Sequence, residues 1–224
     1  MQSYQKLLLA NKAWAAEKLR VDEDYFEELA SHQNPEFLWI GCADSRVPAD
    51  QVTGTQPGDI FVHRNVANLV VHTDINMLSV LQYAVEVLKV KHILVVGHYN
   101  CGGVKASMDN KDYGLINKWL RNIKDVNVKH HEELSKIEDF QARFDRLVEL
   151  NVTEQVRNLA KTTIVQKAWA VGDYPHLHGW VLDLKTGLMK TIMEILPDDL
   201  DSIEPVYRYE VKQPEGVLAE TMKP

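Results

Sequence analysis

The sequence has little of the residue types that mark several common protein classes. Its 224 residues include only two cysteines, which make no disulfide framework and favour the cytoplasm, where thiols stay reduced. Lys and Arg number 25 against 32 Asp and Glu, for a formal net charge of -7. This balance argues against nucleic acid and anionic membranes as partners, because both attract clustered positive charge.

Long apolar runs, internal repeats and low-complexity blocks are also missing. The longest apolar stretches fall far short of a membrane span, and the N-terminal residues lack the apolar region of a signal peptide. We therefore expect a cytoplasmic protein with no membrane contact. The hydrophobic content of 45% is enough to bury a large core, so we expect one domain over residues 1–224.

Two segments of similar design stand out in this composition. Residues 37–41 and 93–97 are apolar runs that each end at a glycine, as buried strands do. Polar side chains with metal-binding or charged groups follow at once. Cys42, Asp44 and Arg46 come after the first run, and His98 and Cys101 come after the second.

The order of strands and helices predicts the fold class. A third strand is expected at residues 60–64, and a largely apolar helix beginning at Thr73 or Asp74 separates it from the strand at 93–97. This alternation predicts an α/β fold with a mostly parallel central sheet flanked by helices. Because functional groups collect at the carboxyl ends of such strands, the polar residues after the two apolar runs are expected to form one site.

The remaining segments are expected around this sheet. Apolar residues at helical spacing over residues 3–19 predict a first helix, and Asp22 or Asp24 could cap a second. Together they predict an N-terminal helical arm at 1–35. This arm covers either its own core or a second subunit. Residues 115–170 read as helical. Residues 177–184 and 188–195 flank a turn and predict a hairpin at the sheet edge, and the acidic, proline-containing segment 197–224 is expected to be a loosely held tail.

The two cysteines and His98 suggest a metal site. Two thiolates and one imidazole suit zinc, and three protein ligands leave the fourth tetrahedral position open, as in catalytic sites. Two thiolates cancel the charge of Zn²⁺, so such a centre needs help in activating water. Asp44 can accept a hydrogen bond from a metal-bound hydroxide, and Arg46 can hold Asp44 in place and keep it ionised.

Each of these residues also has an ordinary structural interpretation. A cysteine at a strand end is usually a small core residue, and an Asp-x-Arg pair is usually a surface salt bridge. The combination favours zinc, but a non-catalytic, zinc-stabilised module with Asp44 as a permanent fourth ligand stays open. The Pro-Cys-x-x-Cys motif that zinc-dependent nucleoside deaminases need is absent, and residues 97–103 do not match the glycine pattern of a dinucleotide-binding loop.

Three blocks carry a resemblance to a known family. Residues 42–46, 61–68 and 97–103 resemble the signature blocks of the β-class carbonic anhydrases, of the bacterial type, and the similarity extends through residues 79–85, 115–117 and 178–180 to about residue 195. The resemblance implies an α/β fold, a homodimer or a tetramer built as a dimer of dimers, and one Zn²⁺ per subunit. The implied activity is reversible hydration of CO2 to bicarbonate and a proton. A same-fold hydrolase of another small linear electrophile, such as carbon disulfide, is the alternative.

The resemblance also assigns roles to individual residues. Cys42, His98 and Cys101 would bind zinc, and Asp44 and Arg46 would form the catalytic pair. The positions that match the family's substrate cleft, part of which comes from a partner subunit, are Gln33, Phe61, Val66, Tyr83 and Gly103.

In one subset of the family, the counterpart of Asp44 can move onto zinc and close the site. A bicarbonate held by a Trp, an Arg and a Tyr favours that closed state. Trp39 and Arg64 match two of the three residues, but Leu182 stands where the tyrosine would be. Since leucine has no hydroxyl to donate, we expect this regulatory binding of bicarbonate to be weakened.

Overall fold

The computed structural model describes residues 2–211, and the contacts within it divide the chain after Asn34 into two compact units. We expected one domain with a helical arm at residues 1–35. Each unit is described separately below. No helix in the described part of the chain has the length and apolar character needed to cross a membrane.

The N-terminal unit consists of two helices, α1 (Ser3–Val21) and α2 (Tyr25–Ser31), close to the bounds that the sequence predicts. They contact each other through Trp14 and Phe26, whose rings meet edge to face at 5.5 Å. None of the described residues in these helices is buried. Large apolar side chains of α1 remain exposed, namely Tyr4, Leu7, Leu8, Leu9 and Leu19.

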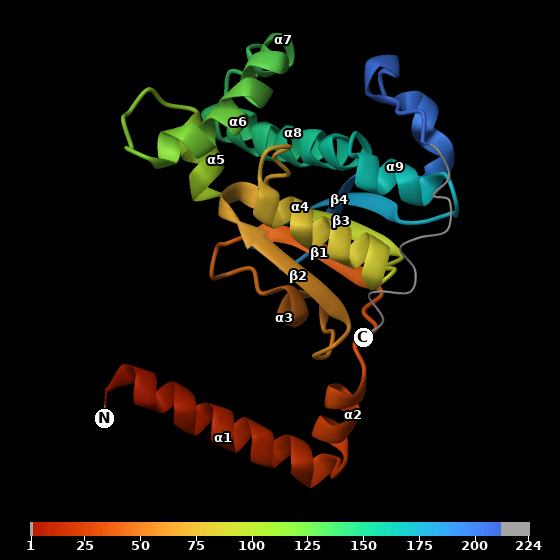
Figure 1. Cartoon of the computed structure of the whole chain (residues 1–224). Coiled ribbons are helices and arrows are strands. Elements are labelled where there is room, and N and C mark those ends of the chain that lie inside the picture. Colours follow the sequence, from red (N-terminus) through yellow and green to blue (C-terminus); the bar gives the residue numbers. More distant parts are fainter. Residues whose placement is uncertain (1, 212–224) are drawn as a thin grey trace. The chain divides into compact units, whose positions relative to one another are not determined.

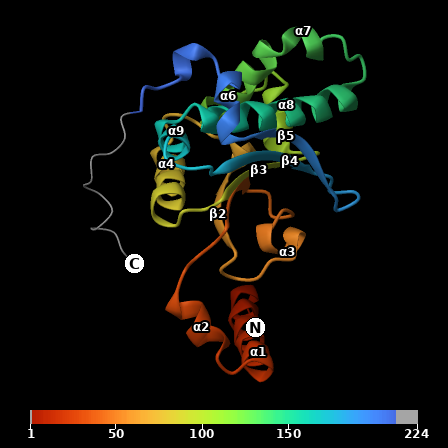
Figure 2. The same ribbon diagram turned by 90° about the vertical axis from the view of Figure 1, so that its right-hand side faces the viewer.

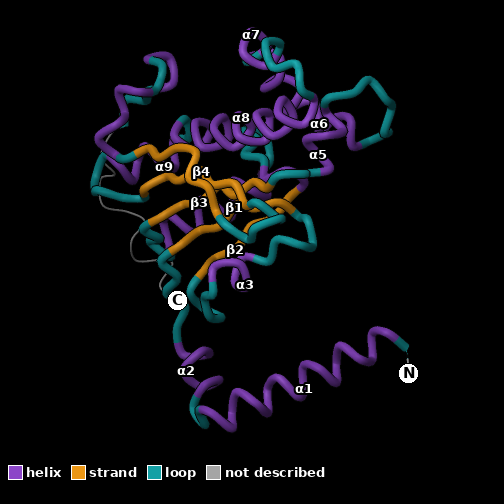
Figure 3. The backbone as a smooth tube through the Cα atoms, turned by 180° about the vertical axis from the view of Figure 1, so that it is seen from behind, coloured by secondary structure: helices purple, strands orange, loops and turns teal. Residues whose placement is uncertain are grey.

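Within residues 35–211, the second unit is built on a five-stranded sheet in the order β2-β1-β3-β4-β5. Its strands are β1 (Phe37–Cys42), β2 (Ile60–Asn65), β3 (His92–His98), β4 (His176–Leu182) and β5 (Met189–Ile195). The first four are parallel, and β5 pairs antiparallel with β4. The expected α/β fold with a mostly parallel sheet is therefore confirmed, and Figure 3 shows its strands in orange among the helices. The hairpin predicted at the sheet edge is present as β4 and β5 (Figure 2).

Helices lie on both sides of this sheet (Figures 1 and 2). Their bounds are α3 (Ala49–Thr53), α4 (Ile75–Gln82), α5 (Gly102–Ser107), α6 (Ile116–Lys129), α7 (His131–Leu134), α8 (Phe140–Ala160) and α9 (Thr163–Trp169), with a π-helical turn η2 (Tyr83–Val87) after α4. The side chain of Asp74 accepts hydrogen bonds from the backbone of Asn76 and Met77, and so caps α4 as expected. The short helices α3 and α5 were not predicted from the sequence.

Two apolar cores follow from the alternation of side chains along the strands. Leu38, Ile40 and Cys42 join a large core with α8, which contacts β3, β4 and β5. Trp39 belongs to a smaller core on the other side, with Ala49 of α3. The α8 layer therefore covers the face of the sheet to which Leu38, Ile40 and Cys42 point.

The segment after β5 is more firmly attached than the sequence suggests. It forms two short 3-10 helices, η3 (Pro197–Ser202) and η4 (Pro205–Tyr207), and Ile203 is buried. Gln166 of α9 donates to the carbonyl of Tyr207 and accepts from the backbone of Tyr209. The loosely held tail that we expected spans residues 197–224, of which residues 212–224 lie outside the described part.

Candidate metal centre

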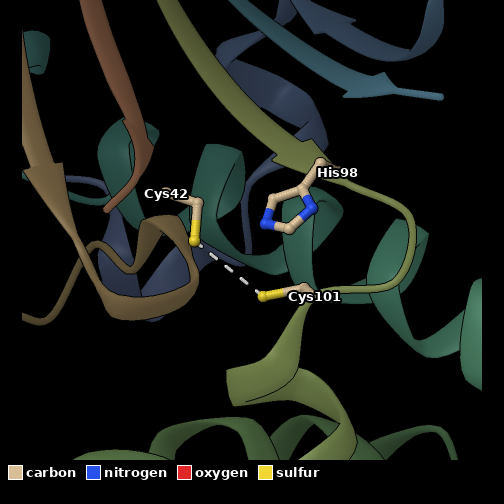
Figure 4. A group of neighbouring side chains, drawn as sticks. All are labelled: Cys42, His98 and Cys101. Atoms are coloured by element: carbon tan, nitrogen blue, oxygen red, sulfur yellow. Dashed lines mark hydrogen bonds between the residues drawn. The ribbon is translucent and has the colours of Figure 1, made fainter. Parts of the chain in front are cut away.

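The three predicted zinc ligands come together at one edge of the sheet. Cys42 is the last residue of β1, His98 is the last residue of β3, and Cys101 directly precedes α5. Because β1 and β3 are parallel neighbours, their carboxyl ends lie at the same edge. Figure 4 shows the three side chains pointing toward one another.

The geometry of these side chains fits a metal ion. The ligand atoms of Cys42, His98 and Cys101 all lie within 4.8 Å of one another, and the two sulfurs are 3.9 Å apart. All three residues are buried, and neither cysteine is in a disulfide. Two sulfurs and one imidazole nitrogen at this spacing are a donor set that suits zinc.

The orientation of His98 supports the same interpretation. Its Nδ1 donates a hydrogen bond to the carbonyl of Tyr99 at 3.0 Å, which leaves Nε2 with a free lone pair. Nε2 is buried and has no hydrogen-bond partner among residues 2–211. A buried nitrogen without a partner is costly unless something binds it, so Nε2 is well suited to be a metal ligand.

The environment of the two thiols favours the ionised form of one of them. The pKa of Cys42 is lowered, mainly because the thiol of Cys101 donates a hydrogen bond to the sulfur, with further help from His98 and two backbone amides. The same pairing, together with burial, raises the pKa of Cys101. A bound cation would stabilise both thiolates.

Asp44 lies beside the centre and is firmly held by Arg46. The Arg46 guanidinium donates from Nε to Oδ1 at 2.9 Å and from Nη2 to Oδ2 at 2.6 Å, and the Arg46 backbone donates to Oδ1 at 2.9 Å. These bonds hold the pKa of the Asp44 carboxyl well below its usual range. Oδ2 is 3.6 Å from His98 Nε2, so the ionised carboxylate faces the metal ligands.

Arg64 has a role in this geometry that the sequence did not suggest. Its guanidinium donates to the backbone carbonyls of Cys42 and Asp44, the first at 2.9 Å, and so braces the segment that carries both residues. Only the three-dimensional structure reveals these contacts, because 20 or more residues separate the partners in sequence.

The expected regulatory residues are placed as follows. Trp39 is fully buried, and its indole N–H has no hydrogen-bond partner within the described residues. Leu182 is also buried and belongs to the same small apolar core. Arg64 lies opposite Gly41 in the sheet, and its Nε and Nη2 donate to the two carbonyls described above.

The predicted substrate-cleft residues form two contact pairs in the second unit. Phe61 and Tyr83 have ring centroids 5.7 Å apart. A Cβ at Gly103 would lie 2.8 Å from Val66 Cγ1, so the absence of a side chain at Gly103 permits this close approach. The backbone amide of Gly103 also favours ionisation of Cys101, which places this pair beside the metal ligands. Gln33 belongs to the N-terminal unit and is exposed.

Fold and site together define a class of protein. It is an α/β metalloprotein with a Cys-His-Cys centre at the carboxyl ends of parallel strands, next to an Asp–Arg pair.

Comparisons with known proteins identify the family. The model of the carbonic anhydrase family matches residues 37–189. The carbonic anhydrase of Emericella nidulans is 49% identical over 206 residues, which are 92% of this chain and 90% of that protein. This chain therefore belongs to the carbonic anhydrase family.

Solved structures agree with this assignment and specify the β class. A tetrameric β-carbonic anhydrase of the filamentous ascomycete Sordaria macrospora has a TM-score of 0.82 and 40% identity, covering 86% of this chain and 98% of its own. A Coccomyxa β-carbonic anhydrase in complex with acetazolamide has a TM-score of 0.83 and 43% identity, covering 87% of this chain and 89% of its own.

Proposed function

We propose that this protein is a zinc enzyme that catalyses the reversible hydration of CO2 to bicarbonate and a proton. The observation that carries the proposal is the buried cluster of Cys42, His98 and Cys101, with the unpartnered His98 Nε2 among residues 2–211 and the ionised Asp44 facing it. Zinc, when bound by these three ligands, supplies a Lewis acid that lowers the pKa of a water molecule.

The protein's own residues supply the remaining requirements of the reaction. Asp44 is an acceptor, and its Oδ2 retains lone-pair capacity to take a hydrogen bond from the attacking water and orient it. Arg46 keeps the carboxylate ionised and fixed in direction. Val66 and Gly103 form an apolar surface beside the ligands, which suits an uncharged, linear substrate such as CO2.

The same contacts weigh against Asp44 as a permanent fourth ligand. Both of its carboxylate oxygens accept hydrogen bonds from Arg46 in this structure. These two bonds restrain the carboxylate against the movement onto zinc that a closed state involves. We therefore propose that the site is open at neutral pH and that the movement of Asp44 onto zinc is a minor state.

We further propose that non-catalytic binding of bicarbonate is weak in this protein. Leu182 replaces the phenol of the expected clamp with a buried apolar side chain, and Arg64 already donates to two carbonyls. Crystals soaked in bicarbonate test this directly. An ordered anion that contacts Trp39 and Arg64, with Asp44 on zinc, would refute it.

A homo-oligomer is part of the proposal. The Sordaria macrospora relative is tetrameric, and the exposed apolar side chains of α1 offer a surface for a second copy of the chain. A dimer or a tetramer would bring the partner's part of the substrate cleft into place.

The location and the subtype are also proposals. Two free cysteines that both serve as metal ligands are compatible with the reducing cytoplasm. The narrower assignment to a bacterial type stays a prediction, since the relatives compared above are those of Emericella nidulans, Sordaria macrospora and Coccomyxa.

The test is stopped-flow CO2 hydration across pH, with zinc content measured on the same sample. We expect turnover at neutral pH, and a loss of about 10²-fold or more in Asp44→Asn with zinc content unchanged. Asp125→Asn is the matched control, because Asp125 forms a surface ion pair with Arg121 on α6.

Two results would contradict this assignment. If Asp44→Asn lost zinc and the native protein showed no turnover, Asp44 would be a structural ligand. If carbon disulfide were hydrolysed and CO2 were not hydrated, the chain would be the same-fold hydrolase.

A further inference from the structure

The turn between β3 and α5 carries two of the three zinc ligands, and Tyr99 lies between them. Its backbone N–H donates to the carbonyl of Leu182 at 3.0 Å, and its own carbonyl accepts from His98 Nδ1. The next residue, Asn100, has a φ of 58°, in the left-handed region. The orientation of the His98 ring therefore depends directly on where the Tyr99 backbone lies.

The side chain of Tyr99 reaches away from this turn to a buried acid. Its hydroxyl donates to Oε1 of Glu149 on α8 at 2.7 Å. Glu149 is only 8% exposed, although it carries a charge. A buried carboxylate is stable only if several hydrogen-bond donors surround it. The donors to Glu149 therefore show which segments of the chain this residue links.

Glu149 receives donors from three different segments. Besides Tyr99, Lys190 of β5 donates to Oε1 at 2.6 Å, and Arg146 of α8 donates to Oε2 at 2.9 Å. Arg146 is itself bonded to Glu133 near the end of α7. The carboxylate thus links the metal-binding turn to the long helix and to the edge strand.

We infer that Glu149 is a positioning residue for the zinc site and that it acts through Tyr99. Glu149 fixes the Tyr99 side chain, the Tyr99 carbonyl fixes the His98 ring, and His98 Nε2 is thereby aimed at the metal. The inference rests on the proposed zinc site, but it concerns the affinity and geometry of metal binding, which are measured without turnover.

The chain contains a matched control for a merely structural role. Glu154 lies on the same helix, is 6% exposed, and accepts from Lys129, His130 and Arg157. Its partners come from α8 itself and from the end of α6, not from the metal-binding turn. A second control is Tyr113, whose hydroxyl also donates to an acid, Asp109, at 2.7 Å, but on the exposed surface.

The experiment compares Tyr99→Phe and Glu149→Gln with Tyr113→Phe and Glu154→Gln in the full chain. Zinc affinity is measured by competition with a chromophoric chelator, and the Co²⁺-substituted proteins are compared by visible absorption. We expect Tyr99→Phe and Glu149→Gln each to weaken zinc binding by about 10–100-fold and to alter the Co²⁺ spectrum. The double variant should lose little more than either single one, because the two residues act in series.

The controls and the native protein separate the possible failures. Glu154→Gln is expected to lower the melting temperature with no change in zinc affinity or in the Co²⁺ spectrum. If Tyr99→Phe binds zinc as tightly as the native chain and has the same spectrum, the inference is wrong. If the native chain binds no metal, the proposed function itself fails. Tyr99→Phe removes one oxygen only, so it remains informative if Glu149→Gln does not fold.

Discussion

The strand that carries His98 approaches the helix behind it closely at Gly97. A Cβ added at this residue would lie 2.7 Å from Cγ2 of Val152 on α8. Val152 is fully buried, so the methyl group has no free space into which it can move. We therefore expect Gly97→Ala to force β3 and α8 apart and to displace His98, the next residue.

The size of the effect follows from the packing. Overfilling a tight core typically costs about 1–3 kcal/mol, and in a chain of this length each kcal/mol lowers the melting temperature by about 2–4 °C. Val152→Ala alone removes two buried methyl groups and should cost about 2–3 kcal/mol. In the double variant the new methyl fills part of that space, so the total should stay near 2–3 kcal/mol.

The measurement is a set of thermal melts of the zinc-loaded native protein, Gly97→Ala, Val152→Ala and the double variant, all at one protein concentration. Gly102→Ala is the control, because a Cβ at Gly102 meets nothing within 4 Å although Cys101 is adjacent. A melting temperature of Gly97→Ala equal to that of the native protein would refute the reasoning. So would a double variant whose loss equals the sum of the two single losses.

Three further predictions follow from the same structure. Arg64→Met should lower CO2 turnover by up to about 10²-fold with zinc retained, because the segment that carries Cys42 and Asp44 loses its two hydrogen bonds from Arg64. Arg64→Lys should recover part of the lost turnover. Chelation of zinc present at about 100 times its dissociation constant should remove about 2.7 kcal/mol of stability, seen as a fall of about 5–11 °C in melting temperature. Burial lowers the pKa of His92 and His178, which face each other, with His176, Glu36 and Glu194 as the charged or titratable neighbours. As pH drops from about 6.5, these histidines therefore bind protons in the unfolded chain before they do so in the folded chain. The stability of the folded chain should consequently fall as pH drops from about 6.5 through the lowered pKa values. His178→Gln should flatten this pH dependence of the melting temperature, and an unchanged slope would show that the cluster does not titrate as described.

The sequence predicted the features that depend on local pattern. Apolar, β-branched runs identify β1 and β3, and the abrupt change to Cys42 and His98 at their ends identifies the metal centre. Asp74 signals the start of α4 because a carboxylate at that position can cap free backbone amides. The short helices α3 and α5 escape such reasoning, since five or six residues are too few to show helical periodicity.

Polar residues on α8 show most clearly what the sequence leaves open. Apolar spacing marks one side of this helix, so Asn151 and Gln155 would be assigned to solvent, yet both are buried. Asn151 donates to the carbonyl of Ala67 and Gln155 accepts from the backbone of Val70, across 84 and 85 residues of sequence. No local pattern encodes such partners. The segment after β2 needs these two side chains as hydrogen-bond partners for its buried backbone groups, so the fold determines what the polar residues of this helix do. The same holds for Glu149, whose proposed role depends on its contact with Tyr99, 50 residues away in sequence.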